Sequence, residues 1–502
     1  MATPSPSLSA KSNVDPTSTS AAPVSQTTSR TATIAIRKMA NDALHIQSQL
    51  TTIYPVIDLP VDVTLEIFMW CNSPDFQEDY WTPTFLLVVC RTWREIALAT
   101  PALWTTLDLD VNKSAKLARG YGSRRWHKRE VERYLELRIT LAHDRLLSVS
   151  LRGSLVQCLG RARFSALLRR LAPRLQRLKL EVEGWGLIDN PPSFPLLHSL
   201  AVILGQYDAT HGGDPMEDIF SNAPQLQEAY LMGHRTRPIH FPWMQLTKFS
   251  GGCISTTEAW HILSAAENLT ECILSLWPSP IDDLNALCHS HLQSLTLRGS
   301  YDLPRGYPPD ILSLLTLPAL RVLELGRIED AANIEQLTPF LSRHSPQLRK
   351  FSFGPYSCTM KALSLECLRL MSQLTCLELS DVEMPLIRAI FRELENPGTP
   401  FLPHIQNLSF LRCASALDSA DMAMLARVLP TRSGVEQIRS FRLEFSLQKH
   451  LDYRSSKGYA AAVADEFRGV RPSLASLIAL AERGMHIYVG TGGWKGANHL
   501  WS

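Results

Sequence analysis

Apolar residues return along most of this chain in one short motif, in which the first, fourth and sixth positions are apolar. Alternation over the last three positions is typical of a β-strand with one buried face. Successive copies start 20 to 33 residues apart, which leaves room for a helix after each strand. The copies begin at Leu175, Leu197, Leu226, Leu246, Leu269, Leu292, Leu320, Leu348, Leu374, Ile405 and Ile438, and Trp104 and Leu146 begin two earlier candidates.

The positions of the prolines support the repeat. Six of the eleven copies have a proline two residues before the first apolar position, where 32 prolines in 502 residues would give fewer than one. They are Pro173, Pro195, Pro224, Pro318, Pro346 and Pro403. A proline there ends the preceding helix and sets the start of the strand. The stretches between copies, such as Ile334 to Ser342 and Met384 to Leu394, have helical spacing, so we expect strand–helix units that bury their apolar faces by stacking.

This spacing resembles that of leucine-rich repeats, whose units have about 20–29 residues. The resemblance implies an α/β fold, an irregular leucine-rich-repeat-like solenoid or horseshoe over residues 105–450. A cap and tail would follow over residues 451–502, with a helix from Ser473 to Arg483 and a strand from Met485 to Val489. The family's asparagine or cysteine, three residues after the last leucine, occurs only as Cys413, so we expect irregular curvature. A plain α/β domain with parallel strands is the alternative.

The N-terminal part has helical rather than alternating periodicity. Two apolar stripes follow Pro60, one with Leu59, Val63, Ile67 and Trp70 and the other with Val61, Leu65 and Phe68. A helix with two apolar sides needs two apolar neighbours. A polar loop from Cys71 to Pro83 precedes an apolar run that keeps helical spacing from Phe85 to Ala97, and Pro101 ends that helix. Short helices of this extent bury too little surface for comfortable stability alone, so a partner helix is expected.

The order of residues in this part resembles an F-box, in the form common among fungal F-box proteins, over residues 57–104. The resemblance is carried by Leu59-Pro60, Ile67-Phe68, Val88-x-Cys90-Arg91-x-Trp93-Arg94 and Pro101-x-Leu103-Trp104. It implies docking onto the Skp-type adaptor of a Skp–cullin–F-box ubiquitin ligase. The implied adaptor-binding residues are Leu59, Pro60, Val63, Ile67, Leu87, Val88 and Trp93, and the implied core residues are Phe68, Cys90 and Ile96.

Where the family has a serine- and valine-rich helix start, this chain has Leu87-Val88-Val89, which leaves the contact register open by one residue. The alternative is an ordinary helical subdomain that packs on the rest of the chain, with Trp93 in its core. Before this part, residues 1–32 hold almost no large apolar side chains and predict a disordered tail. Residues 33–56 keep helical spacing and predict a helix that leads into the F-box.

The net charge of the chain limits the classes of molecule that it is expected to bind. The 50 basic and 48 acidic residues give a net charge of +2, so no global field draws the chain to nucleic acid or to a membrane. The basic segment from Lys113 to Arg133, with Trp126, could contact phosphates. Glutamates interleave with these cations, and a solvated helix with ion pairs on its face is the competing interpretation.

Chemistry-bearing motifs are missing from the sequence. The ten cysteines include no CxxC pair and no grouping with histidine, so we expect no metal and no cofactor. No apolar run reaches the roughly 18 residues of a membrane span, and no signal pattern is present, so a cytoplasmic and/or nuclear location is expected. The glycine-rich end, Gly490 to Gly496, lacks the following helix that a phosphate loop requires, and we interpret it as a cap or tail.

No nucleophile-elbow, zinc-protease, P-loop or kinase motif occurs. The sequence therefore favours a non-catalytic substrate receptor that joins a Skp-type adaptor and cullin to an unknown protein substrate. Mixed charges at the strand positions between the apolar ones favour a protein partner, and the candidate substrate-binding residues are Lys179, Tyr230, Ile273, Glu324, Glu378 and Arg442. The alternatives are a leucine-rich-repeat scaffold outside ubiquitination and an undetected hydrolase or transferase with a deep polar pocket.

Overall fold

A computed structural model of the chain describes two compact units, Met1–Leu103 and Trp104–Ser502. The described residues are 59–71, 83–112, 128–182, 192–203, 219–233, 240–277, 279, 284–299, 311–328, 337–344, 347–355, 363–396, 398, 401–413, 419–431, 438–445 and 471–491. The expected tail over 1–32 and the helix over 33–56 therefore lie outside the described residues, as does most of the predicted loop after Cys71.

The described residues of the first unit are helical. They form α2 (Val61–Cys71), the 3₁₀-helix η3 (Pro83–Phe85), α3 (Leu86–Val89) and α4 (Arg91–Leu98), and the 3₁₀-helix η4 (Pro101–Trp104) follows. The run that the sequence suggests as one helix from Phe85 is divided at Cys90, whose φ of −154° and ψ of 172° are extended. The Trp93 N–H donates to Cys90 Sγ over 3.4 Å, so Cys90 caps the start of α4.

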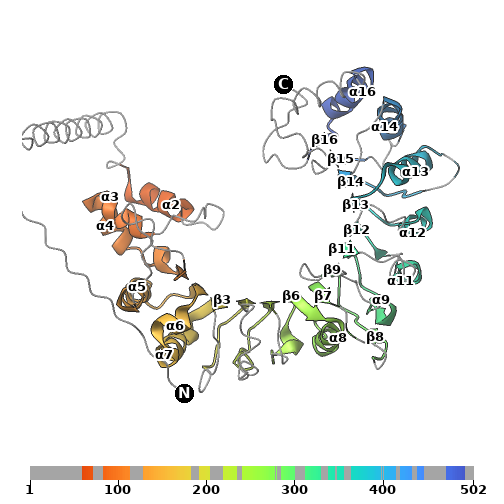
Figure 1. Ribbon diagram of the computed structural model, residues 1–502. Helices are drawn as coiled ribbons and strands as arrows, with labels where there is room; N and C mark the ends of the chain where they lie inside the picture. The colour runs from red at the N-terminus through yellow and green to blue at the C-terminus, as the bar shows by residue number, and fades with distance from the viewer. Residues whose placement is uncertain are drawn as a thin grey trace, which may run out of the picture. The chain divides into compact units, whose positions relative to one another are not determined.

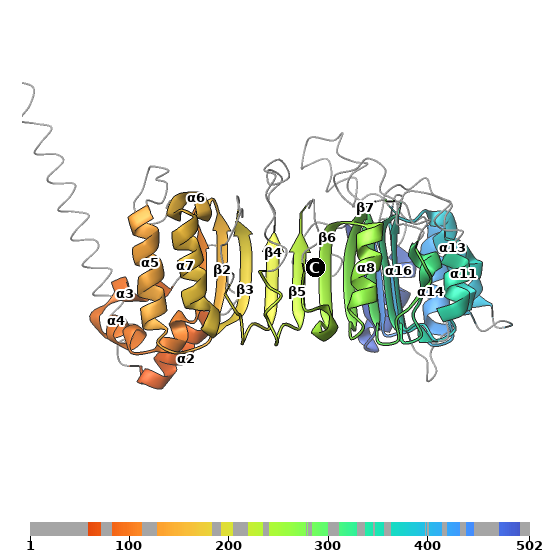
Figure 2. The same cartoon turned by 90° about the horizontal axis from the view of Figure 1, so that it is seen from below.

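The second unit contains a parallel sheet of 14 strands, and the strands follow one another in the sheet in chain order (Figure 1). They are β1 (Thr106–Asp110), β2 (Leu147–Gly153), β3 (Leu175–Val182), β4 (Ser199–Ile203), β5 (Glu228–Met232), β6 (Lys248–Ser255), β7 (Glu271–Trp277), β9 (Ser294–Gly299), β11 (Val322–Ile328), β12 (Lys350–Pro355), β13 (Cys376–Ser380), β14 (Asn407–Cys413), β15 (Ser440–Phe445) and β16 (His486–Thr491). The short strands β8 (Leu287–Cys288) and β10 (Leu315–Thr316) pair with each other instead. Figure 2 shows the neighbouring strands side by side with a common direction.

The helices of this unit lie along one face of the sheet (Figure 1). They are α5 (Lys128–Leu141), α6 (Leu155–Leu159), α7 (Arg161–Leu171), α8 (Thr256–Ala265), α9 (Ile311–Leu314), α11 (Leu337–His344), α12 (Leu365–Leu370), α13 (Met384–Glu395), α14 (Ser419–Thr431) and α16 (Arg471–Glu482). Between β3 and β6 the only helix in the described residues is the 3₁₀-helix η7 (Trp243–Gln245). The α/β class that the sequence predicts is confirmed, with a large parallel sheet that does not close into a barrel.

The motif's apolar positions form the core. Leu323 pairs with Leu295 on one side and Phe351 on the other, and Leu325 pairs with Leu297 and Phe353. These side chains are at most 2% exposed, and the same register continues along the sheet. The first position of one expected copy is displaced, because Leu146 is 45% exposed whereas Leu147 is 2% exposed; its other positions, Val149 and Leu151, are buried as expected.

Recurring prolines in the described part of the chain lie in turns rather than simply after helices. The Leu226 N–H donates to Ala223 O over 3.1 Å, and the Leu320 N–H donates to Leu317 O over 3.2 Å. Pro224 and Pro318 therefore occupy the second position of a four-residue turn, where a fixed φ near −65° is favoured. Copies without proline keep the same bond, as Leu269 N to Ala266 O shows at 3.1 Å.

The last strand extends the sheet beyond the expected repeats. Helix α16 and strand β16 fall where the sequence predicts a helix and a strand in the C-terminal part. Strand β16 is parallel to β15, with Phe441 opposite Ile487 and Leu443 opposite Val489. The boundary between the array and its C-terminal part stays a prediction.

Candidate functional site

The first unit carries an unusual amount of exposed apolar surface. Its core is small: Phe68 is fully buried, and the Trp93 ring meets the Phe68 ring edge-on at 4.9 Å between centroids. Helix α4 is tied to α3 because Arg94 Nε donates to Leu87 O over 2.6 Å. The second stripe does not form as expected, since Thr64 and Phe68 are the buried residues of α2 and Val61 is 55% exposed.

The expected adaptor residues are largely on the surface. Leu59, Pro60, Val63, Ile67 and Val88 are exposed, and Leu87 and Trp93 are half-buried. Of the expected core residues only Phe68 is buried, whereas Cys90 and Ile96 are half-buried.

Sequence reasoning missed part of this surface. Val61, Met69, Trp70, Phe85, Val89 and Leu98 are also exposed. For Val61, Met69, Trp70 and Val89 the signal was the high apolar content of α2 and α3, which leaves apolar side chains on more than one side of each short helix. We call the exposed apolar side chains between Leu59 and Leu98 the apolar surface of the first unit.

The second candidate region is the face of the sheet away from the helices. The six expected substrate-binding residues occupy one register row, which we call the central row. It runs Lys179, Ala201, Tyr230, Ser250, Ile273, Thr296, Glu324, Ser352, Glu378, Ser409, Arg442 and Tyr488. The strand periodicity thus places all six on one face, but strand spacing of about 4.8 Å keeps the outer members far apart.

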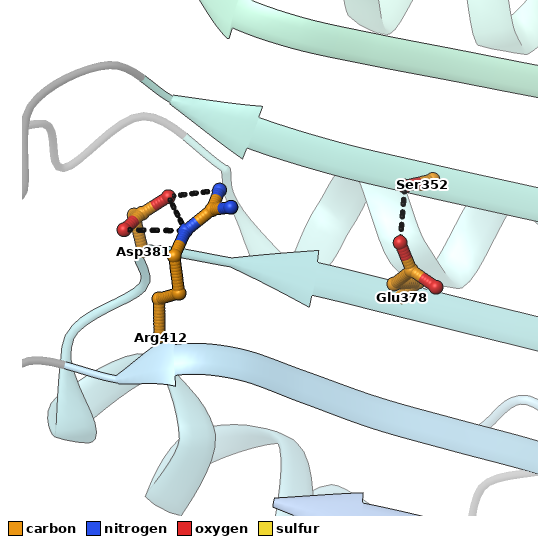
Figure 3. A network of polar contacts seen from close by, with 4 residues as sticks. All are labelled: Ser352, Glu378, Asp381 and Arg412. Carbon is orange, nitrogen blue, oxygen red and sulfur yellow. Dashed lines mark hydrogen bonds and ion pairs between the residues drawn. The ribbon is translucent and has the colours of Figure 1, made fainter. Parts of the chain in front are cut away.

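Polar contacts link neighbours along the C-terminal half of this face. Ser352 Oγ donates to Glu378 Oε1 over 3.2 Å, and Arg412 Nη2 donates to Asp381 Oδ2 over 2.6 Å (Figure 3). Lys350 pairs with Glu324, and that hydrogen bond raises the pKa of the Lys350 ammonium. Glu324 and Asp381 are therefore held by cations of the same chain, and Glu378 by a serine hydroxyl.

A hollow of about 260 Å³ opens on this face over strands β4 to β7. In the central row its lining alternates between small side chains, Ala201 on β4 and Ser250 on β6, and larger ones, Tyr230 on β5 and Ile273 on β7. We call it the central hollow, and the lining residues used below are Ser199, Ala201, Glu228, Tyr230, Lys248, Ser250, Glu271 and Ile273. Of the expected residues, only Tyr230 and Ile273 meet here, and burial raises the pKa of the Tyr230 phenol.

The basic segment is only partly described. Residues 113–127 lie outside the described part, and the segment's end forms the start of α5. Glu132 and Glu136 of α5 form ion pairs with Arg163 and Arg170 of α7. The expected pairs on the face of one helix are thus replaced, for these two glutamates, by pairs between helices.

Comparisons with known proteins identify no relative. No model of a known protein family matches the chain, and no curated protein matches it. In the described residues no three metal-ligating side chains are grouped to hold an ion. None of the described helices combines the length and apolarity that crossing a bilayer requires.

Proposed function

We propose that the chain is the non-catalytic substrate-recognition subunit of a Skp–cullin–F-box ubiquitin ligase. The apolar surface of the first unit docks a Skp-type adaptor, and the polar face of the sheet binds a protein substrate. The repeats form a leucine-rich-repeat-like solenoid, a horseshoe. Ubiquitin transfer occurs on other subunits, and this chain contributes proximity alone.

One observation carries the proposal. Ten of the fifteen large apolar side chains found exposed in the described residues lie between Leu59 and Leu98. Val88 is 73% exposed and Trp70 62% exposed. Full burial of a large apolar side chain typically contributes about 1.5–3 kcal/mol of stability. Exposed apolar side chains concentrated in one short segment in this way are typical of a protein interface.

The identity of the partner rests on the order of residues rather than on apolarity. The Leu-Pro pair before α2, the Cys-Arg-x-Trp-Arg stretch at the start of α4 and the Pro-x-Leu-Trp end resemble an F-box. A helix from the adaptor supplies the second apolar neighbour that α2 lacks.

The sheet face suits a protein substrate. It presents a lysine, a tyrosine, an isoleucine, two glutamates and an arginine in the central row, and cations and carboxylates pair on the same face. A mixed surface of this kind favours neither nucleic acid nor an anionic membrane. The proposed location is accordingly the cytoplasm and/or the nucleus, with no cofactor.

The test is adaptor capture by the full-length chain. Val63→Glu with Val88→Glu places two charges on exposed positions of the apolar surface without touching Phe68, so the variant should fold and lose at least tenfold in adaptor affinity. Leu146→Glu is the matched control, because Leu146 is an exposed leucine of the second unit. It should bind the adaptor as the wild type does.

Binding of the adaptor by the Val63→Glu, Val88→Glu variant at wild-type strength would contradict the proposal, as would a wild-type chain that captures no adaptor. Proximity labelling in cells that recovers neither adaptor nor cullin would assign the chain to scaffolding instead.

A further inference from the structure

The central hollow has a net negative charge. Lys248 Nζ lies 3.7 Å from Glu228 Oε1 and 3.7 Å from Glu271 Oε2. Both distances are longer than a hydrogen bond, and the Lys248 side chain is 54% exposed. One ammonium thus stands between two carboxylates, which leaves one negative charge beside the hollow.

The walls of the central hollow are aromatic and apolar. Tyr230 and Ile273 stand on β5 and β7, on either side of Ser250 in the central row. The Tyr230 hydroxyl donates to Met232 Sδ over 3.2 Å. A side chain that enters between Tyr230 and Ile273 can pack its stem on apolar groups and its end on the tyrosine ring. Carboxylates lie at the edge of the hollow, within reach of a polar end group.

We propose that the central hollow binds an arginine side chain from an extended segment of the protein substrate. The inference rests on the proposed function, since it names the substrate feature that the sheet face reads. The volume of about 260 Å³ is below the usual 300–1,000 Å³ of small-molecule pockets. The hollow therefore accommodates one side chain rather than a whole ligand.

Arginine fits this lining better than lysine. A guanidinium group is planar, stacks on aromatic rings and has donors on several sides, so it can stack on Tyr230 and donate to a carboxylate at the same time. An ammonium is a compact point charge that would stack poorly on the ring.

The same chain contains an internal example of this recognition. The Arg442 guanidinium lies over the Tyr488 ring at 5.3 Å from its centroid, and Arg442 Nη2 donates to Glu444 Oε2 over 2.7 Å. These residues lie on β15 and β16, on the same face of the sheet. The central hollow offers a tyrosine and glutamates without an arginine among its lining residues.

The experiment measures peptide binding to the full-length chain by fluorescence polarisation. The probes are four fluorescein-labelled nonapeptide pools whose central residue is arginine, lysine, glutamate or alanine, in a background of serine, glycine, threonine and alanine. We expect the arginine pool to bind roughly tenfold more tightly than the alanine pool, the effect of about 1.4 kcal/mol from charge-assisted contacts. The lysine pool should fall between them.

Glu228→Gln and Glu271→Gln should each reduce the arginine preference by about fivefold, because each removes a charged acceptor while keeping the side-chain shape. Tyr230→Leu should weaken the arginine pool more than the lysine pool. Glu366→Gln is the matched control, since Glu366 is an exposed glutamate of α12 and does not line the hollow, and it should keep the wild-type preference.

Equal binding of the four pools, a preference for lysine or glutamate, or an arginine preference that survives in a Glu228→Gln, Glu271→Gln double variant would overturn the inference. Adaptor capture is measured on the same samples to separate the two proposals. A chain that prefers arginine but captures no adaptor would refute the ligase assignment and leave the hollow as a peptide site. A chain that captures adaptor without preferring arginine would refute the hollow alone.

Discussion

Two buried histidines connect neighbouring repeats through backbone groups. His344 Nε2 accepts from the Leu317 N–H over 2.8 Å, and its Nδ1 lies 2.7 Å from Phe340 O. His289 has the same kind of bridge, with Nδ1 accepting from the Leu292 N–H over 3.2 Å and Nε2 2.9 Å from Ala266 O. Each bridge requires a neutral ring with one donor and one acceptor nitrogen. The histidines are thus structural parts of the turns before β9 and β11.

We expect the stability of the chain to depend on pH through His344. Burial lowers the pKa of His344 below its ordinary value of 6.5, and Arg343 acts in the same direction. As pH falls below 6.5, the unfolded chain binds a proton that the folded chain resists, so the free energy of unfolding decreases. His344→Gln keeps a donor and an acceptor without a titratable group, and it should flatten this decrease in urea unfolding between pH 8 and pH 5.

The matched control is His291→Gln, because His291 is exposed and its loss should leave the wild-type pH slope intact. A His344→Gln variant with the same pH slope as the wild type would show that His344 is not the group responsible.

At the scale of elements, β6 shows how one repeat compensates for an incomplete motif. The sixth motif position is Gly251, and a Cβ there would overlap Ile254 Cδ1. The register between β6 and β7 shifts between Gly251 and Ile254, and Cys253 has a positive φ of 57°. This bulge turns Ile254 back into the core, where it is fully buried. The missing side chain is thus replaced from three residues further along the strand.

A double-mutant cycle can test whether Ile254 occupies the space of the side chain that Gly251 lacks. Gly251→Ala should lower the free energy of unfolding by about 1–3 kcal/mol through overpacking, and Ile254→Val should cost about 0.5–1.5 kcal/mol through the lost methyl group. Because Ile254→Val removes the overlapping Cδ1, the double variant should be more stable than the sum of the two losses predicts. Additive losses in urea unfolding would argue against direct replacement.

At the scale of the whole sheet, the N-terminal edge needs protection. The Ser148 N–H donates to Thr105 O and the Val111 N–H to Arg152 O, so the alternation of a parallel strand turns the carbonyls of Thr106 and Asp108 away from β2. Arg138 of α5 donates to Thr106 O, and the Tyr134 hydroxyl donates to Asp108 O over 3.4 Å. Tyr134 and Arg138, one helical turn apart on α5, thus cover the two outward carbonyls of β1. The free edge of this strand could otherwise pair with another chain, and the two donors block it.

Removing both donors should leave the carbonyls of Thr106 and Asp108 without these hydrogen bonds and free to pair with another chain. We expect Tyr134→Phe with Arg138→Met to lower the thermal midpoint, since each buried unsatisfied carbonyl costs about 1–3 kcal/mol, and to produce concentration-dependent self-association in sedimentation velocity. Arg133→Met is the control, because Arg133 is an exposed arginine of the same helix. A double variant that remains monomeric would assign the protection of β1 to other parts of the chain.

The local periodicity of the sequence predicted much of the strand and helix arrangement. It predicted less about which residues of the candidate sites lie together. Alternation placed Leu323 and Leu325 in the core and Glu324 on the other face, because successive strand residues point to opposite sides. Sequence also located α13 and the strand before it. It did not reveal the break at Cys90, where a thiol caps α4 without the usual capping residue. It also missed the shift from Leu146 to Leu147 and the bulge at Cys253, because both depend on pairing with strands that are distant in the chain. The F-box resemblance stays a prediction.

The sequence by itself determined the repeating strand phase and hence which residues share the polar face of the sheet. Only the tertiary structure decided which of them meet. Glu228, Lys248 and Glu271 are far apart in sequence, and the register of three neighbouring strands brings their charges together. A strand's own pattern fixes the side to which a residue points, whereas its neighbours across the sheet are fixed by non-local hydrogen bonds and by the length of the connections between strands.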